Sequence, residues 1–331
     1  MKPKLKDFFK KQGISKFNGR RIEECVIPHF SKIREKPILP DQTNRMRQFF
    51  LFSILFILCG NLSAGNDPQF PGARRAGLAG AFTAVNGDLW ALGANPAGIT
   101  GLTRPVAGMY MERRFLLKEI NSGAFAFAMP FNEKHFVALD FSGFGFATYN
   151  DSRLALSYAT NLLGKLSLGA KFNVVHTTIK EYSSATSFVL DAGLQAQVTQ
   201  TFTMGFSIFN ASQSYLSKAI REKIPTVLNL GVCWKPSKKV MATADISKAE
   251  NYPLSFRFGV EYQPVDMLAI RAGVATNPLI LSFGLGVKWK NAILNVANTW
   301  HERLGYTPHL GIDFAFGKEK KKATIPPPKK K

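Results

Sequence analysis

The sequence predicts an all-β fold: a transmembrane antiparallel β-barrel of about 14 strands, preceded by an N-terminal hatch or plug segment. Three observations predict it. From about Val106 onward the chain consists of segments of about 8–12 residues, many of which alternate with a period of two. The apolar positions carry bulky side chains, whereas the positions between them are mostly small or polar. The segments number 14, and bacterial single-chain barrels have even strand numbers.

The alternation is clear within single segments. One of them sets Leu166, Leu168, Ala170, Phe172 and Val174 against Ser167, Gly169, Lys171 and Asn173. A soluble β-sandwich also alternates, so alternation alone leaves that alternative open. Bulky apolar residues on one face and small or polar residues on the other favour lipid outside and a polar interior. The expected strands are 106–115, 122–130, 135–143, 152–160, 165–174, 187–198, 201–210, 226–235, 239–247, 255–264, 267–275, 278–289, 291–299 and 308–317.

Loop lengths and aromatic residues give the barrel two different ends. Short turns are expected at 131–134, 199–200 and 236–238, and longer loops at 176–186, 211–225 and 300–307. Outer-membrane barrels have short periplasmic turns and longer outer loops. Four aromatic residues lie at strand ends beside the short turns, where a girdle at the membrane interface is expected: Tyr158, Trp234, Tyr262 and Trp289. In a soluble sandwich they would be core residues instead.

Residues 46–65 have the layout of a secretory signal peptide that begins at an internal methionine, Met46. Arg45 and Arg47 precede an apolar run from Phe49 to Cys59, interrupted only by Ser53, and small residues follow at Ala64 and Gly65. As a helix that run is about 16 Å long, roughly half of a bilayer core, so a permanent membrane helix is disfavoured. Residues 1–45 are either a mis-assigned extension or a disordered basic leader, and both interpretations exclude them from the fold.

The formal charge of +21 raises the question of a nucleic-acid partner. Residues 1–45 carry a net +7 and residues 318–331 a net +6, so 13 of the 21 charges belong to the two terminal segments. The remaining +8 forms no stripe, and no nucleic-acid partner is expected. The lysine- and proline-rich stretch 318–331 is expected to be a disordered tail. The domains are then the leader, the signal peptide, a hatch over 66–105, the barrel over 106–317 and the tail.

The hatch region does not alternate, and it carries a family resemblance. Gly72-Ala73-Arg74, the run from Gly80 to Val85, and Asn95-Pro96-Ala97-Gly98 resemble the mature N-terminus of the FadL-like superfamily of outer-membrane barrels. Within it the segment is most similar to the PorV/PorQ-type family of Bacteroidetes-like bacteria. The resemblance implies a 14-stranded barrel whose N-terminal segment folds inward, with Asn95, Pro96 and Ala97 as the recurrent element of the hatch. A segment that merely packs beneath the barrel is the alternative.

Small residues fit this interpretation, because they let a backbone approach a barrel wall closely. Pro96 restricts both its own backbone and that of Asn95, which suits a rigid turn. The final segment, Gly311 to Phe316, resembles the aromatic signal that barrel-assembly machinery recognises on a last strand, so that machinery is an expected partner during biogenesis. Outer-membrane lipid is the other expected partner.

Motifs for enzyme chemistry are missing from the sequence. There is no G-x-S-x-G, Walker, HExxH or CxxC motif, and the five histidines are scattered. We therefore expect no enzyme activity, cofactor or metal site. Charged side chains expected to face the interior either line a lumen or form structural ion pairs, the latter being favoured. They are Arg153, Lys171, Asp191, Arg257, Glu261, Arg271 and Asp313.

The resemblance implies one of two functions in the outer membrane. The leading hypothesis is passive, FadL-like transport of hydrophobic small molecules, in which a hydrophobic ligand passes the hatch or leaves through the barrel wall. The alternative is a PorV/PorQ-type component or substrate carrier of the type IX secretion system, which implies secretion-system partners. A purely structural barrel is the third possibility.

Overall fold

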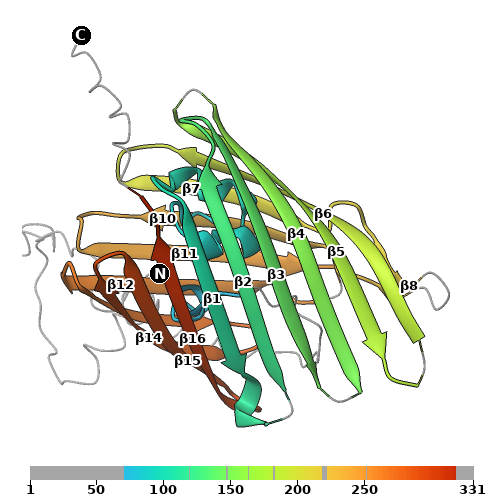
Figure 1. Ribbon diagram of the computed structural model, residues 1–331. Coiled ribbons are helices and arrows are strands. Elements are labelled where there is room, and N and C mark those ends of the chain that lie inside the picture. Colours follow the sequence, from blue (N-terminus) through green and yellow to red (C-terminus); the bar gives the residue numbers. More distant parts are fainter. Residues whose placement is uncertain are drawn as a thin grey trace, which may run out of the picture. The chain divides into compact units, whose positions relative to one another are not determined.

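The computed structural model describes residues 71–118, 120–146, 148–162, 164–181, 183–217, 222–250 and 252–317. The expected leader, signal peptide and C-terminal tail, and residues 66–70 of the expected hatch, lie outside the described residues. The described part contains a closed barrel of 14 strands (Figure 1). Its strands are β1 (Val106–Arg113), β2 (Asn121–Pro130), β3 (His135–Phe146), β4 (Tyr149–Leu162), β5 (Leu166–Ile179), β6 (Ser183–Gln197), β7 (Phe202–Phe209), β10 (Val227–Trp234), β11 (Val240–Ala249), β12 (Ser255–Val265), β13 (Leu268–Ala275), β14 (Ile280–Trp289), β15 (Ala292–His301) and β16 (Gly305–Ala315).

The barrel is a simple antiparallel meander. Each strand pairs with the next barrel strand along the chain, and β1 pairs with β16 to close the ring, with Tyr110 opposite Gly311. A small hairpin of β8 (Tyr215–Ser217) and β9 (Glu222–Lys223) lies in the connection between β7 and β10. All 14 expected strands are present, so the predicted fold class and strand number are confirmed.

The two rims of the barrel are distinguished by the chain itself. We call the rim where β1 begins and β16 ends the terminal edge, and the opposite rim the loop edge. The expectation of long loops at one rim is wrong in most places, because strands continue through the residues assigned to loops. β5 and β6 extend to Ile179 and from Ser183, and β15 and β16 extend to His301 and from Gly305. The long connection at 210–226 is confirmed.

Side chains alternate between the two faces of the wall as a lipid-embedded barrel requires. Leu156 and Phe188 point outward and are 60% and 59% exposed, whereas Ser157 and Asn173 point inward and are fully buried. Apolar atoms on the outside and polar atoms on the inside reverse the arrangement of a water-soluble protein. The four expected girdle residues, Tyr158, Trp234, Tyr262 and Trp289, are all exposed on strands that run to the terminal edge.

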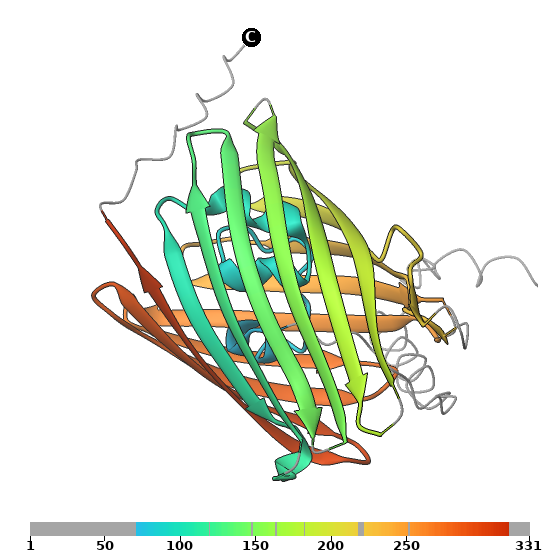
Figure 2. The same cartoon turned by 45° about the vertical axis from the view of Figure 1, so that its right-hand side comes forward.

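Residues 71–105, which we call the plug, lie inside the barrel (Figure 2). They form α3 (Ala73–Ala76) and two 3-10 helices, η1 (Leu89–Gly93) and η2 (Pro96–Gly101). The main apolar cores of the molecule lie between the plug and the wall. In one of them Leu89, Trp90 and Ile99 of the plug contact inward-facing wall residues such as Tyr110 and Phe136.

Candidate functional site

Side-chain caps determine where the two 3-10 helices of the plug begin. The carboxylate of Asp88 accepts a hydrogen bond from the backbone N–H of Trp90 at the start of η1. The side-chain Oδ1 of Asn95 accepts from the N–H of Ala97 at the start of η2, and Pro96 occupies the first helical position. Asx caps and a proline at the first position are favoured at helix starts, because these backbone donors otherwise lack partners. The Asn-Pro-Ala element is thus a helix start.

Asn95 also fixes the plug to the barrel wall. It is fully buried, and its Nδ2 donates to the carbonyl oxygens of Thr83 in the plug and Leu194 on β6, at 2.9 and 3.0 Å. On the neighbouring strand, Ser207 Oγ donates to the carbonyl of Ala94 at 2.7 Å. Of the expected hatch element, Asn95 therefore lies against β6 and β7, and Pro96 and Ala97 lie beside Gly169 of β5, deep inside the barrel.

The wall makes room for the plug with glycines. On nine strands an inward-facing glycine is so close to the plug that an added Cβ would contact plug atoms. At Gly273, for example, that Cβ would lie 2.6 Å from the carbonyl carbon of Leu78, which is far inside van der Waals contact. The nine are Gly108, Gly169, Gly193, Gly205, Gly231, Gly259, Gly273, Gly284 and Gly311. At seven of them the added Cβ would lie closer than 3.0 Å to a plug atom, so a side chain does not fit without a shift; at Gly284 and Gly311 the nearest plug atoms are 3.1 and 3.3 Å away. Together the nine form the glycine seat of the plug.

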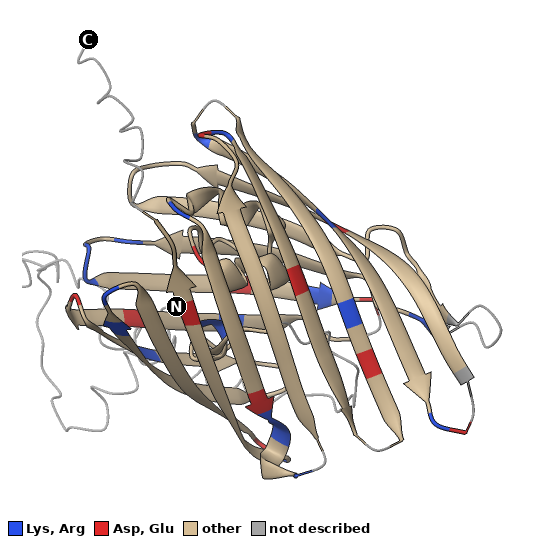
Figure 3. Ribbon diagram, viewed as in Figure 1, with Lys and Arg blue, Asp and Glu red and all other residues tan. Residues whose placement is uncertain are grey.

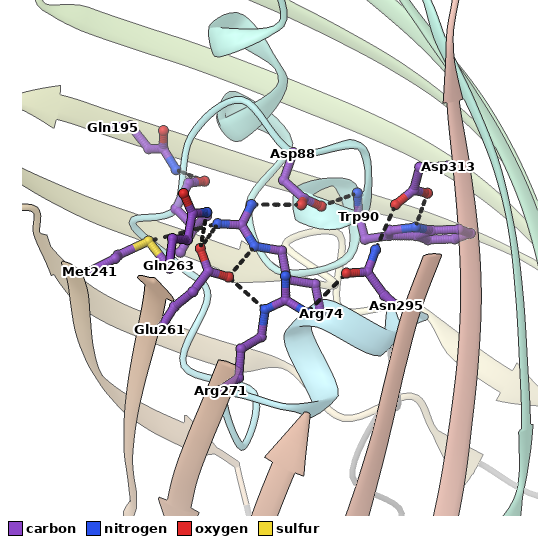
Figure 4. Close-up of polar contacts among 11 residues, drawn as sticks. Arg74, Asp88, Trp90, Gln195, Met241, Glu261, Gln263, Arg271, Asn295 and Asp313 are labelled. Atoms are coloured by element: carbon purple, nitrogen blue, oxygen red, sulfur yellow. Dashed lines mark hydrogen bonds and ion pairs between the residues drawn. The ribbon is translucent and has the colours of Figure 1, made fainter. Parts of the chain in front are cut away.

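A buried polar network attaches α3 to the opposite side of the wall (Figure 4). Arg74 donates to Glu261 through Nε and Nη2, at 2.8 and 2.7 Å, and to Asp88 through Nη1, at 3.0 Å. Arg271 on β13 donates to the same Glu261 at 2.6 Å. A bidentate arginine–carboxylate pair is strong and directional, and both partners of Arg74 are nearly buried. Two arginines and two carboxylates therefore balance within this network.

The network continues to the strand that closes the barrel. Arg271 donates to Asn295 Oδ1 at 2.9 Å, and Asn295 Nδ2 donates to Asp313 on β16 at 3.1 Å. The indole Nε1 of Trp90 donates to the other oxygen of Asp313 at 2.7 Å. Elsewhere Asp245 on β11 accepts three bonds from the plug, from the N–H of Phe82 and from the N–H and Oγ1 of Thr83. The plug is thus held by charge-assisted bonds on several sides.

The seven charged residues expected to face the interior do so. Glu261, Arg271 and Asp313 belong to the network above. Lys171 pairs with Asp140 at 2.9 Å, and Asp191 accepts hydrogen bonds from Asn173 and from the backbone of Asn210. These five are almost fully buried, so they fill the interior and do not line open water. Arg153 and Arg257 line cavities, and Arg153 also lies 5.3 Å from the ring of Phe209.

Two small cavities lie on the loop-edge side of the plug. One has a volume of about 140 Å³ between α3 and the inner faces of β1 and β12 to β16. The other, of about 50 Å³, lies against β1 to β4. Tyr110, Glu112 and Arg114 line both. On the remaining side, Ile224 of the connection between β7 and β10 packs with Tyr252 against the inward-facing Val189 and Phe209. The described residues therefore leave small cavities on the loop-edge side of the plug.

Glu112 is the centre of the polar wall shared by the two cavities. Its carboxylate accepts hydrogen bonds from Tyr110 Oη at 2.7 Å and from Arg114 Nε at 2.8 Å, and it lies 3.2 Å from His309 Nδ1. His309 Nε2 lies 3.0 Å from Thr299 Oγ1. These polar groups already have partners within the wall, so a molecule in the larger cavity does not have to supply hydrogen bonds to them.

Sequence reasoning missed the plug side of the site. Arg74, Asp88 and Trp90 precede the barrel and follow no strand periodicity, so nothing in the sequence marked them as partners of wall residues. The glycine seat had a visible signal, because glycines recur at inward positions of alternating segments. Their common function appears only when the strands are placed side by side. Within the described residues there is no cluster of three His, Cys, Asp or Glu side chains suited to a metal ion, and no helix is long and apolar enough to cross a membrane.

Comparison with known proteins supports the architecture. No protein-family model and no curated protein matches the sequence. Among solved structures, a FadL homologue of Pseudomonas aeruginosa is similar, with a TM-score of 0.57 and 13% identity over 77% of this chain and 100% of that one. The monoaromatic hydrocarbon channel CymD gives 0.59 and 14% over 75% and 98%. The Pseudomonas putida toluene transporter TodX gives 0.59 and 12% over 76% and 98%. The chain therefore has the fold of FadL-type barrels, as the sequence predicted.

Proposed function

We propose that this chain is an outer-membrane barrel that moves small, largely apolar molecules across the membrane, with the plug as its hatch. The observation that carries the proposal is the cavity of about 140 Å³ between the plug and the wall. It lies on the loop-edge side of the plug, and the plug fills the barrel beneath it. A molecule that entered from the loop edge would stop in this cavity, next to the residues that must rearrange to let it pass.

The size of the cavity limits the cargo. A cavity of about 150 Å³ in another protein accommodates benzene, so this one has the volume for a single aromatic ring. Apolar atoms from Ala79, Ala275 and Ile280 contribute to its lining, beside the polar groups around Glu112. Solved structures with the same fold include a monoaromatic hydrocarbon channel and a toluene transporter. A compound of the size of toluene is therefore the cargo that we propose.

The bonds that hold the plug favour a local route past it. Arg74, Asn95 and Asp245 fix the plug at separate places, and extraction of the whole segment would leave several buried polar groups without partners. The stretch from Ala76 to Gly80 forms the floor of the cavity and includes two residues with positive φ, Ala79 at 51° and Gly80 at 79°. We infer that the cargo leaves by a rearrangement of this stretch or through the adjacent wall.

An uptake experiment tests the proposal. Cells that carry the chain in an otherwise intact outer membrane should take up radiolabelled toluene faster than cells without it. Ala275 is buried and lines the cavity, so Ala275→Phe should fill the space and reduce uptake to the background rate. The matched control is Val274→Phe on the neighbouring, outward-facing position of β13, which should leave uptake unchanged. Equal uptake by the Ala275→Phe variant and the original chain would overturn the proposal.

The secretion-system alternative remains a prediction from the sequence resemblance. It predicts a barrel without a bound small molecule that co-purifies with secreted proteins. Native mass spectrometry on protein purified from outer membranes in mild detergent separates the two functions. A reproducibly bound small molecule that is lost in the Ala275→Phe variant supports transport, and an empty barrel that arrives with secreted proteins favours the PorV/PorQ-type function.

A further inference from the structure

The terminal edge of the barrel carries a strong positive charge. Its turns, the residues before β1 and the last two residues of β14 contain eight basic residues and two acidic ones, Glu133 and Asp266. The basic residues are Arg104, Lys134, Lys165, Lys235, Lys238, Lys239, Lys288 and Lys290. All except Arg104 are exposed. Figure 3 shows blue segments in the turns at this rim, whereas most of each strand is uncoloured. We call these eight residues the basic ring.

The loop edge differs in how its charge is balanced. Among the described residues there, Lys180 is followed by Glu181, and Arg303 follows Glu302. Lys223 lies 3.8 Å from Glu250, and Arg114 lies 2.8 Å from Glu112. The exposed Arg113 and Lys118 also belong to this edge. In the basic ring, Lys235, Lys238 and Lys239 share one turn that contains no acidic residue. The positive charge is therefore concentrated at the terminal edge, which differs from an ordinary solvated surface on which charges of both signs are mixed.

The basic ring directly borders the outward-facing apolar surface. Lys235 follows the exposed Trp234, and the exposed Trp289 lies between Lys288 and Lys290. The ammonium group of Lys290 lies 5.3 Å from the centroid of the Trp289 ring. Exposed tryptophans beside lysines are typical of the interface between hydrocarbon and headgroups. There the ring contacts the interface, and the lysine extends to the polar side.

We propose that the basic ring binds the anionic headgroups of glycerophospholipids in the leaflet that surrounds the terminal edge. The proposal rests on the proposed location of the chain in the outer membrane, with the terminal edge facing the periplasm. Each lysine close to an anionic lipid surface raises the affinity for that surface roughly fivefold. The phosphodiester is the group recognised, and the adjacent apolar band and aromatic girdle hold the acyl chains and the interface of the same lipid.

The distribution of the ring favours lipid over an acidic protein. Its members come from the turns β2–β3, β4–β5, β10–β11 and β14–β15 and from the start of β1, which are spread around the circumference. A protein partner would bind one face, whereas lipids surround the whole rim.

Lipid titration followed by native mass spectrometry tests the inference. Full-length barrel in mild detergent is titrated with phosphatidylglycerol or with phosphatidylcholine, and the number of retained lipids is counted. We expect phosphatidylglycerol to be retained preferentially. The triple variant Lys235→Gln, Lys238→Gln, Lys239→Gln should lower its apparent affinity by about a hundredfold, at roughly fivefold per lysine. The matched control carries Lys118→Gln, Lys180→Gln and Arg303→Gln at the loop edge and should keep the preference.

The outcomes are distinguishable from failure of the transport proposal. Heat-modifiable migration in electrophoresis reports whether each variant is folded, and toluene uptake reports transport separately. A folded barrel that binds both lipids equally, or loses the preference equally in both triple variants, overturns the basic-ring inference. It does so even where toluene uptake is intact. If the original chain gives no toluene uptake but keeps its preference for phosphatidylglycerol, only the transport proposal is overturned.

Discussion

Arg74 of the plug donates two hydrogen bonds to the carboxylate of Glu261 on β12, although 187 positions separate the two residues in the chain. Glu261 also accepts from Arg271, and Arg74 also donates to Asp88. The pair therefore connects a segment that precedes the barrel with two strands in its second half. Arg74 and Glu261 each have a further charged partner inside the barrel. Loss of either residue therefore leaves buried charges without compensation.

Replacement of Arg74 tests how strongly this pair holds the plug. In Arg74→Gln, Asp88 loses its cationic partner and Glu261 keeps only Arg271. Removal of one partner from a buried ion pair costs about 3–5 kcal/mol, and we expect the free energy of unfolding to fall by that order. Urea titration in detergent, followed by tryptophan fluorescence, measures the change. Arg113→Gln is the control, since Arg113 is exposed at the loop edge and should cost less than about 0.5 kcal/mol.

The glycine seat predicts that a side chain on the inner wall displaces the plug. At Gly193 a Cβ would overlap Asn95 and lie 2.8 Å from Pro96, so Gly193→Val should push η2 away from β6. Single-channel conductance in planar bilayers should then rise from near zero to a measurable level. Gly143→Val is the matched control, because nothing lies within 4 Å of its added Cβ. If both variants remain non-conducting, the glycine seat accommodates a side chain at Gly193.

Asn95 has two functions that different substitutions separate. Asn95→Asp keeps an oxygen that caps η2 at the N–H of Ala97, but loses the Nδ2 donor to Thr83 and Leu194. Asn95→Ala loses both the cap and the donor. We expect hydrogen exchange at the amide of Ala97 to accelerate at least tenfold in Asn95→Ala and much less in Asn95→Asp. Exchange that accelerates equally in both variants would mean that the contact with the wall, and not the cap, protects that amide.

Trp90 and Asp313 should be energetically coupled. Trp90→Phe retains an aromatic ring 5.8 Å from Tyr110 but removes the donor to Asp313, at a cost of about 1–3 kcal/mol. Asp313→Ala removes the acceptor, and in the double variant the total loss of unfolding free energy should be about 1 kcal/mol smaller than the sum of the two single losses. A double-mutant cycle of unfolding free energies measures this coupling. Trp289→Phe, on the outer surface, is the control for the change of ring size. Strict additivity would contradict a direct bond.

The sequence allowed the barrel to be predicted almost strand by strand, because a wall between lipid and a polar interior imposes a period of two on every segment. Leu156 and Ser157 show the principle, since their exposures are 60% and 0%. The loops at 176–186 and 300–307 were predicted wrongly, because strands that extend beyond the expected span no longer alternate clearly. His176 and Thr186, for example, are polar and pair with each other across β5 and β6.

The site was predictable only in part. Asn95-Pro96-Ala97 carried a local signal, because the capping residue and the proline are adjacent in the sequence. The partners Arg74 and Glu261 carry no such signal, since their proximity depends on the plug entering the barrel. The inward direction of Lys171, Asp191 and Asp313 followed from strand parity. Whether they would meet water or a buried partner depended on how completely the plug fills the interior.

The position of Trp90 has a consequence for how the barrel is assembled. The indole lies against Gly108 of β1 and donates to Asp313 of β16, so one plug residue contacts both strands of the seam that closes the ring. β1 and β16 are the paired strands farthest apart in sequence, and the entropic cost of bringing two strands together grows with their separation. A plug that is already bound to β1 or β16 offers its Trp90 contact to the other strand and so brings the two strands together. We therefore expect Trp90→Phe to slow the appearance of the folded band during refolding into lipid vesicles, whereas Trp289→Phe should leave the rate unchanged.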